Sequence, residues 1–385
     1  MLHTATSQQI RDGLVTDVYF KRTEKILRAK GIDKEVRAEF MAKGLPHEWP
    51  WAVFAGVEEC HALLQDLPVN VRIMKEGTLI KPFQPVMEIH GKYLDFGKYE
   101  TALLGLICQA SGVATMAARC RKAAGERQII SFGARRMHPA IAPLVERNAY
   151  IGGCDGVAVG LGADLVGAEP VGTMPHALIL IMGDTVTATK AFHEVIEPHV
   201  RRVSLIDTLN DEKIEALNVA KALGDNLYAL RLDTPGSRRG DFSKIMEEVR
   251  WELDIRGYGH VKILLSGGLD EYQIMKYNDF ADAYGVGTAI SNAPVIDFSM
   301  DIIEIEGEPI AKRGKRSGSK SVYRCPHCFD TSVLPVGTSP DQCRCGGKKE
   351  ELLEAFLSEG QKKSPLPGPE EIRSFVIQQV EKVEL

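Results

Sequence analysis

From about residue 128 onward, short apolar runs alternate with longer helical stretches, and this rhythm constrains the fold more than any other feature. Two parallel strands need a crossover connection, usually a helix, so the rhythm predicts a parallel sheet. Seven predicted strands in this region suggest an irregular, incomplete βα barrel, and a doubly wound open sheet is the competing layout. The predicted strands cover residues 129–132, 156–159, 165–168, 203–206, 227–232, 261–265 and 281–284, and the predicted helices cover 139–150, 176–196, 212–223 and 242–255.

The segments on either side of this region lack the rhythm. We predict an N-terminal α+β domain over residues 1–115 and a βα barrel with the active site over 116–293. A C-terminal segment over 294–385 would contain a small zinc-binding lobe at about 320–350 and a final helix. Here the predicted strands are 36–40, 53–57, 69–73, 86–89, 302–305 and 309–311, and the predicted helices are 58–67, 98–124, 350–357 and 370–383.

Charge and hydropathy exclude several classes of protein. With a net charge of −5 and a pI of about 6.1, the chain lacks the basic surface that sequence-independent nucleic-acid binding requires. No apolar run approaches the length of about 20 residues that spans a membrane. Residues 1–13 lack the apolar core of a signal peptide. We therefore expect a cytoplasmic protein.

Polar segments follow the predicted strands, at the edge where parallel α/β folds bind ligands. Arg135 and Arg136 follow the first strand of the barrel and could clamp a phosphate or carboxylate, or could be surface arginines at a helix start. Arg231 and Asp233 lie two residues apart at another strand end, so they point to the same side. Asp233 could accept hydrogen bonds from the hydroxyls of a ribose, and a helix-capping loop is the alternative.

The segment 169–176 ends in a histidine that would open a helix. A helix N-terminus favours phosphate, and histidine can act as a base or as a nucleophile toward phosphorus. His176 is therefore a candidate catalytic residue, and a capping or packing histidine is the alternative. Glu169 and Thr173 in the same segment are candidate substrate-binding residues.

Two glycine-rich turns follow the last two predicted strands. Glycine lets backbone N–H groups approach phosphate oxygens, and such turns on the last two strands form the usual phosphate site of a βα barrel. The candidate phosphate-binding residues are Ser266, Gly267, Gly268, Gly285, Gly287 and Thr288. The chain contains no GxxxxGK[ST] and no GxGxxG after the first strand, which disfavours a P-loop ATPase and a Rossmann dehydrogenase.

These residues resemble a known family, the nicotinate phosphoribosyltransferases of the type II phosphoribosyltransferase fold. The resemblance covers about residues 10–300, and the length and C-terminal cysteines are most similar to the archaeal branch. The segments that carry it are Thr16-Asp17-Val18-Tyr19, Phe132-Gly133-Ala134-Arg135-Arg136, Gly172-Thr173-Met174-Pro175-His176, Arg231-Leu232-Asp233, Ser266-Gly267-Gly268-Leu269-Asp270 and Gly285-Val286-Gly287-Thr288.

The resemblance implies an enzyme of NAD salvage that joins nicotinate to the phosphoribosyl group of phosphoribosyl pyrophosphate and releases pyrophosphate. Nicotinate would stack on Tyr19, delivered from a neighbouring subunit, and Arg135 would hold its carboxylate or a nearby phosphate. His176 would be phosphorylated by ATP. Arg231 and Asp233 would face the ribose and pyrophosphate, the glycine turns would hold the 5-phosphate, and Mg²⁺ would bridge the pyrophosphate oxygens.

The resemblance also implies a homo-oligomer, a dimer or an assembly of dimers, whose subunits share active sites. One position departs from the family pattern. Many members carry serine after the phosphorylated histidine, and this chain has Ala177. The departure bears on base selectivity and on ATP coupling, and leaves the predicted fold unaffected.

The eight cysteines fall into two sets. Cys325-x₂-Cys328 and, fourteen residues later, Cys343-x-Cys345 have the spacing of two metal knuckles. In a reducing cytosol this pattern suggests a metal rather than disulfides. Four thiolates would fill a tetrahedral Zn²⁺ site, so we predict a structural zinc, with iron in a rubredoxin-like site as the alternative. The scattered cysteines, predicted to be buried inert thiols, are Cys60, Cys108, Cys120 and Cys154.

Other functions remain open at this stage. The closest alternatives are a nicotinamide or a quinolinate phosphoribosyltransferase, although a second carboxylate on the base would need more basic residues. An alternative from another class is a zinc-ribbon protein that uses the barrel as a scaffold and binds RNA through residues 312–316. Basic stretches of this kind are more often solvated loops.

Overall fold

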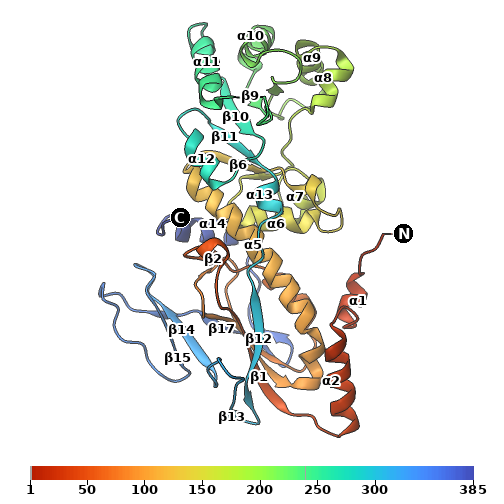
Figure 1. Ribbon diagram of the computed structural model, residues 1–385, viewed down its shortest axis with the longest axis vertical. Coiled ribbons are helices and arrows are strands. Elements are labelled where there is room, and N and C mark those ends of the chain that lie inside the picture. Colours follow the sequence, from red (N-terminus) through yellow and green to blue (C-terminus); the bar gives the residue numbers. More distant parts are fainter. Residues whose placement is uncertain (1, 239) are drawn as a thin grey trace. The chain divides into compact units, whose positions relative to one another are not determined.

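The computed structural model describes residues 2–238 and 240–385, and the chain divides into two compact units (Figure 1). The unit that we call the mixed unit combines the residues up to 115 with residues 294–385. The other, the barrel unit, spans residues 116–293. Helix α5 (Glu100–Ala124) begins in the mixed unit and ends in the barrel unit.

The mixed unit is built on a seven-stranded antiparallel sheet with the order β13-β12-β1-β5-β3-β17-β18. The inner strand β1 pairs with β12 and β5 along its two edges, and nearly its whole length is buried. The strands are β1 (Glu35–Ala42), β2 (Ala52–Val53), β3 (Asn70–Met74), β4 (Leu79–Ile80), β5 (Pro85–Lys92), β12 (Phe298–Ile305), β13 (Glu308–Pro309), β14 (Lys320–Arg324), β15 (Thr331–Pro335), β16 (Glu350–Glu351), β17 (Leu353–Ser358) and β18 (Gln361–Lys362). The helices are α1 (Ser7–Arg11), α2 (Val18–Ala29), η1 (Pro46–Glu48), α3 (Val57–Leu64), α4 (Tyr93–Phe96), η2 (Gly97–Tyr99) and α14 (Pro369–Val380).

The barrel unit contains a curled sheet of six strands in the order β7-β6-β11-β10-β9-β8. Every strand pair in it is parallel, as the alternation of strands and helices predicts. Its strands are β6 (Gln128–Ser131), β7 (Gly156–Val157), β8 (Val203–Leu205), β9 (Ala229–Leu232), β10 (Lys262–Ser266) and β11 (Ala283–Val286). Its helices are η3 (Ala134–Arg136), α6 (Ala142–Ile151), α7 (Gly160–Val166), α8 (His176–Met182), α9 (Thr185–Val195), α10 (Glu212–Leu223), η4 (Gly224–Asn226), α11 (Phe242–Asp254), α12 (Glu271–Tyr277) and α13 (Thr288–Ser291).

Two predictions about the barrel unit are wrong in detail. Residues 165–168 are not a strand, because α7 occupies Gly160–Val166 and buries Gly162, Ala163 and Val166 at helical spacing. The single helix predicted over 176–196 is two helices, α8 and α9. Gly183 ends α8 in a left-handed conformation with a φ of 93°, and the side chain of Asp184 then caps α9.

The helix predicted over 350–357 is also wrong, since this segment forms β16 and β17. β17 pairs with β3 in antiparallel register, with Leu353 opposite Met74. An available sheet edge therefore overrides the local helix preference of Glu, Leu and Ala.

The basic segment before β14 is a largely exposed loop, as its composition predicts, but its lysines also form ion pairs with buried acids. Lys312 and Lys315 both form ion pairs with the carboxylate of Asp301, whose side chain is 2% exposed. Lys320 Nζ lies 2.8 Å from Glu39 Oε2, and that carboxylate is buried as well. These three lysines neutralise buried acids and so attach the segment to the sheet.

Helix α5, with the turns before it, is the most apolar part of the chain. The stretch Tyr93–Ala124 is long and apolar enough to cross a membrane by length and composition, contrary to the sequence expectation. In the folded protein, however, 61% of its most apolar window is buried. A core helix has this property, and α5 supplies buried residues to both units.

One buried ion pair allows a test of what stabilises the barrel unit against unfolding. Arg119 Nε of α5 lies 3.0 Å from Glu271 Oε1 of α12, and the two side chains are 3% and 4% exposed. We expect Glu271→Gln to lower the free energy of unfolding by about 3 kcal/mol, because the buried guanidinium loses its counter-charge. Urea denaturation measures this. Glu247→Gln, which breaks an exposed pair with Lys244, is the matched control and should cost less than about 1 kcal/mol. Equal losses in the two variants would contradict the expectation.

Candidate active site

Arg231, near the carboxyl end of β9, is fixed by hydrogen bonds from all three of its guanidinium nitrogens. Nε donates to Ser266 Oγ at 2.9 Å, Nη1 to Thr173 Oγ1 at 3.0 Å, and Nη2 to Asp233 Oδ2 at 3.2 Å. Ser266 in turn donates to Asp233 Oδ1 at 2.9 Å. Burial lowers the pKa of Arg231, and the Asp233 carboxylate opposes that effect. The guanidinium is therefore a cation held in one orientation at the sheet edge, where it can bind an anion.

Phe132 gives this site an aromatic face. The guanidinium carbon of Arg231 lies 5.0 Å from the centroid of the Phe132 ring. The ring fills the space beside Gly285, where an added Cβ would lie 2.2 Å from a ring carbon. Gly285 lies within β11, so its missing side chain provides room for this ring.

His176, the first residue of α8, lies within reach of two polar side chains. Its Nδ1 is 2.9 Å from Thr208 Oγ1, and its Nε2 is 3.7 Å from Asp233 Oδ2. Asp207, the neighbour of Thr208, has both carboxylate oxygens buried without a hydrogen-bond partner in the described part of the chain. Burial raises the pKa of Asp207, Asp233 raises it further, and His176 lowers it. Arg231 is already the cation beside Asp233, and both oxygens of Asp207 remain available to a further cation.

The two glycine turns lie at the ends of β10 and β11. Gly267 and Gly268 have φ angles of 91° and 67°, which only glycine adopts without strain. An added Cβ on Gly267 would lie 3.1 Å from Asp233 Oδ1, so this turn passes close to the carboxylate. Gly287 and Thr288 begin α13 at the next turn. Both turns therefore leave the sheet at the edge that carries Arg231.

The remaining predicted site residues of the barrel unit are exposed. Arg135 and Arg136 extend from η3, and the positive charge of Arg135 contributes to the lowered pKa of Arg231, so these two arginines are neighbours. Glu169 lies in the segment after α7 and makes no contact with the Arg231 network in the described chain. It lines a separate cavity of about 460 Å³ that also reaches Thr173.

That cavity is a hollow between the amino ends of the strands. Its lining includes Gly156, Ala229 and Ala283, which are small residues near the starts of three strands. A closed βα barrel is filled by bulky side chains at such positions. The barrel unit therefore lacks a fully packed interior at this end.

Tyr19 belongs to the mixed unit, whereas Arg231 belongs to the barrel unit. It is the second residue of α2, and 56% of its surface is exposed. Its ring centroid lies 4.3 Å from that of Phe20. The ring is therefore exposed on the mixed unit.

Sequence reasoning missed three side chains that the structure places in the site. Asp207 and Thr208 directly follow the predicted strand 203–206, so the strand-end rule that selected Asp233 could have selected them too. Phe132 lay inside a segment that carried the family resemblance, but an aromatic residue at a strand end is also typical of a core. Only its distance from Arg231 reveals its place in the site.

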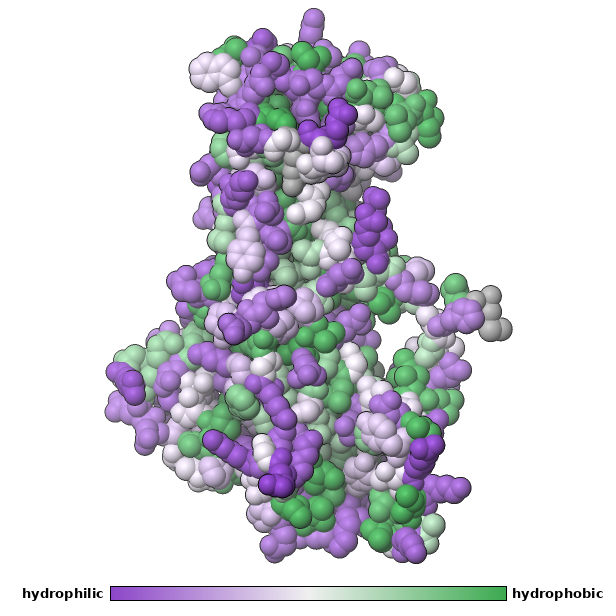
Figure 2. Space-filling view, viewed as in Figure 1, coloured by the Kyte–Doolittle hydropathy of each residue, from purple (hydrophilic) through white to green (hydrophobic). Residues whose placement is uncertain are grey.

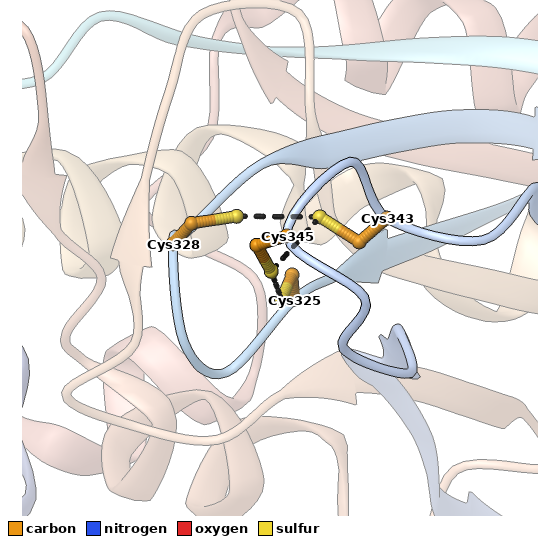
Figure 3. A group of neighbouring side chains, drawn as sticks. All are labelled: Cys325, Cys328, Cys343 and Cys345. Carbon is orange, nitrogen blue, oxygen red and sulfur yellow. Dashed lines mark hydrogen bonds between the residues drawn. The ribbon is translucent and has the colours of Figure 1, made fainter.

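The four clustered cysteines converge in the mixed unit (Figure 3). All four Sγ atoms lie within 4.8 Å of one another, with 3.4 Å between Cys325 and Cys345 and 3.3 Å between Cys328 and Cys343. Tetrahedral zinc with Zn–S bonds of about 2.3 Å needs sulfur atoms about 3.8 Å apart, so the group fits such an ion. The backbone N–H of Cys328 lowers the pKa of the Cys325 thiol to about 6, which favours the thiolate that a metal requires.

Comparison with known proteins agrees with this geometry. Two family models match in succession: quinolinate phosphoribosyl transferase, N-terminal domain, over residues 17–111, and its C-terminal domain over residues 113–301. A solved structure, described as nicotinate-nucleotide pyrophosphorylase from Pyrococcus furiosus, is 52% identical with a TM-score of 0.98, and the match covers 100% of this chain and 99% of that one.

Two more distant relatives point the same way. A nicotinate phosphoribosyltransferase of Mycobacterium tuberculosis is 28% identical over 373 residues, which is 85% of this chain and 82% of the relative. The structure of human nicotinic acid phosphoribosyltransferase covers 96% of this chain and 94% of its own with a TM-score of 0.78, and at 20% identity it shows a common fold. The chain belongs to the type II phosphoribosyltransferase family, among the nicotinate phosphoribosyltransferases.

Proposed function

We propose that the protein is a nicotinate phosphoribosyltransferase, which converts nicotinate and phosphoribosyl pyrophosphate to nicotinate mononucleotide and pyrophosphate in the NAD salvage of the cytoplasm. The observation that carries this proposal is the Arg231 network. It places a rigid cation between an aromatic face and two glycine turns, and these three features match the pyrophosphate, the base and the 5-phosphate. The named relatives support the choice of reaction.

The base would lie against the Phe132 ring, with its carboxylate toward Arg135. An arginine distinguishes the anionic nicotinate from a neutral amide, because it forms a charge-assisted, bidentate pair with a carboxylate. Tyr19 of a neighbouring subunit would cover the other face of the base. Quinolinate carries a second carboxylate, and Arg231 would not be available to it, because the pyrophosphate and three side chains of its own chain would engage its N–H groups.

Phosphoribosyl pyrophosphate would bind along the sheet edge. The turns at 266–268 and 287–288 would hold its 5-phosphate through backbone N–H groups, and Asp233 would accept hydrogen bonds from the ribose hydroxyls. The displacement at the ribose C1 passes through a cation-like transition state in which negative charge gathers on the departing pyrophosphate. Arg231 would stabilise that charge without reorganising, because its partners already fix it.

Mg²⁺ fits the acidic side of this site. Carboxylate oxygens are the ligands that Mg²⁺ prefers, and both oxygens of Asp207 are without a hydrogen-bond partner in the described residues. When bound, the ion would neutralise pyrophosphate oxygens. Asp207 and Asp233 are the residues of this chain that would hold it.

His176 is the residue that we propose for ATP coupling. Thr208 holds Nδ1 of its ring, and Nε2 faces Asp233. A histidine oriented in this way can accept a phosphoryl group from ATP and later release it to water. The hydrolysis would drive nucleotide formation forward.

We also propose a homo-oligomer with shared active sites. A hydrophobic patch lies over the α8 end of the barrel unit (Figure 2). In α8, Leu180 is 60% exposed and Ile181 is 83% exposed. We propose that a second copy covers this patch and that Tyr19 of a neighbouring subunit completes the site.

The RNA-binding alternative loses part of its support. Three of the five basic residues between 312 and 320 form ion pairs with Asp301 and Glu39, which neutralises part of the positive charge of this segment. The cysteine group instead supports a structural zinc, because four thiols leave a tetrahedral ion no open position.

A panel of three bases tests the proposed activity. Purified protein, phosphoribosyl pyrophosphate and Mg²⁺ are incubated with nicotinate, nicotinamide or quinolinate, and the mononucleotide is measured by chromatography. We expect kcat/KM for nicotinate to exceed the other two by at least about 100-fold, because the pocket pairs one carboxylate with one arginine. Arg135→Ala should reduce the preference, and Arg256→Ala, at an exposed arginine just after α11 and outside the site, is the control. Equal turnover of nicotinamide would contradict the assignment.

A second test addresses ATP. We expect His176→Ala to abolish the stimulation of synthesis by ATP and the accompanying ATP hydrolysis, while slow ATP-independent synthesis continues. His199→Ala, an exposed histidine of the same unit, should behave like the unchanged protein. Rates with and without ATP are compared for each. Stimulation that survives in His176→Ala would show that this residue is not the phosphoryl acceptor.

A third test addresses the metal. We expect about one zinc per chain by mass spectrometry of the metal, and a lower Tm after chelation or in Cys328→Ser, because a structural zinc contributes folding free energy. Cys108→Ser removes a thiol outside the cluster and should retain the zinc. If a chelator stopped turnover at once while circular dichroism and Tm stayed constant, the structural role would be wrong.

A further inference from the structure

The N-terminal arm, residues 7–29, is fastened to the turn where α5 begins. Tyr99 Oη donates to the carbonyl oxygen of Arg11 at 2.8 Å. Gly13 has a φ of 70°, and an added Cβ there would lie 2.8 Å from Cδ of Lys98. The chain at this point is therefore in close contact with the residues just before α5.

Thr101 makes the contact nearest to α2. Asp17 N donates to Thr101 Oγ1 at 3.1 Å, and Thr101 Oγ1 donates to Asp17 Oδ2 at 3.1 Å. Asp17 is the N-cap of α2, yet its side chain makes no capping hydrogen bond to that helix. Its carboxylate is used by Thr101 instead, so Thr101 fixes the start of α2 two residues before Tyr19.

Glu100 lies next to this contact in an acidic setting. Burial and the charges of Asp301 and Asp17 raise its pKa to about 7, and Lys312 opposes them. Lys312 Nζ is also only 2.6 Å from Asp301 Oδ1, so Asp301 shares the lysine whose charge lowers the pKa of Glu100. The titratable groups that face Glu100 are Asp17 and Tyr19 of α2, Tyr93 of α4, Asp301 of β12 and Lys312 of the segment before β14.

We propose that Thr101 and Glu100 are positioning residues for Tyr19, and that ionisation of Glu100 loosens the arm by repelling Asp17. A neutral Glu100 leaves the bond between Thr101 and Asp17 undisturbed, so the arm is held most firmly below pH 7. As the pH rises through 7, a negative charge forms beside Asp17, and the contact weakens. The proposal rests on the proposed function only for the contact between Tyr19 and the base.

Hydrogen exchange of the full-length protein tests whether Thr101 and Glu100 hold the N-terminal arm in place. After correction for the intrinsic rates, we expect the protection of amides 18–29 to fall about three- to tenfold between pH 6 and pH 8, the range of one hydrogen bond. Glu100→Gln should abolish this pH response and keep the high protection. Thr101→Val should lower protection at both pH values, and Thr101→Ser should restore it. Asp95→Asn, at a nearby acid outside this group, is the control.

Steady-state kinetics test the positioning part. Thr101→Val should raise KM for nicotinate about three- to tenfold and leave kcat within about twofold, with rescue by Thr101→Ser. In the unchanged protein, KM for nicotinate should rise between pH 6 and pH 8 as the arm loosens. This rise should disappear in Glu100→Gln and persist in the Asp95→Asn control.

Unchanged protection of α2 in Thr101→Val, or a pH response that persists in Glu100→Gln, would overturn the proposal. A change in exchange without any change in KM would overturn it as well, because Tyr19 would then not be positioned for the base. If the unchanged protein makes no nucleotide at all, the proposed function fails, and the exchange measurements alone decide whether these residues hold the arm.

Discussion

The register between β9 and β10 is the constraint on which the rest of the site depends. The two strands pair in parallel with Arg231 opposite Leu264, and Ser266 therefore reaches both Arg231 and Asp233 from the adjacent strand. A shift of one residue would turn Ser266 to the other face of the sheet and release both. The short strands and the helices between them therefore determine the geometry of the candidate site as well as the fold. They set the direction of the one cation that Phe132, Thr173 and Asp233 surround.

The sequence could predict the parallel sheet of the barrel unit, and it selected candidate site residues at the strand ends, because both follow from periodicity. Strands that alternate with helices must run parallel, and residues just after the strands then meet at one edge, which is how Arg231, Asp233 and Ser266 were found. The same rule placed His176 in the site for a partly wrong reason, since the segment before it belongs to α7 and not to a strand. Glycines and small residues in α7 concealed its helical period.

Other features depend on contacts between distant parts of the chain, which periodicity does not encode. The strand β17 forms along the edge of β3, and the side chains of Lys315 and Lys320 are buried because they pair with the buried carboxylates of Asp301 and Glu39. The cysteine spacing predicted a metal group, but not how it is attached. Arg324, the residue before Cys325, donates to Leu79 O at 2.8 Å and to Gln379 Oε1 at 2.9 Å, which links the knuckle to β4 and α14.

The contact between Gly285 and Phe132 couples the side-chain sizes that these two positions can accommodate. No side chain can be added at 285 while the phenyl ring stays where it is, because the Cβ would lie inside the ring's van der Waals envelope. Conversely, a smaller residue at 132 would leave an empty space against the glycine, and the cation at 231 would lose its aromatic neighbour. A change of side-chain size at either position therefore requires a coordinated substitution at the other, one within β11 and one just after β6, and single-site variation explores only intermediates that pack poorly.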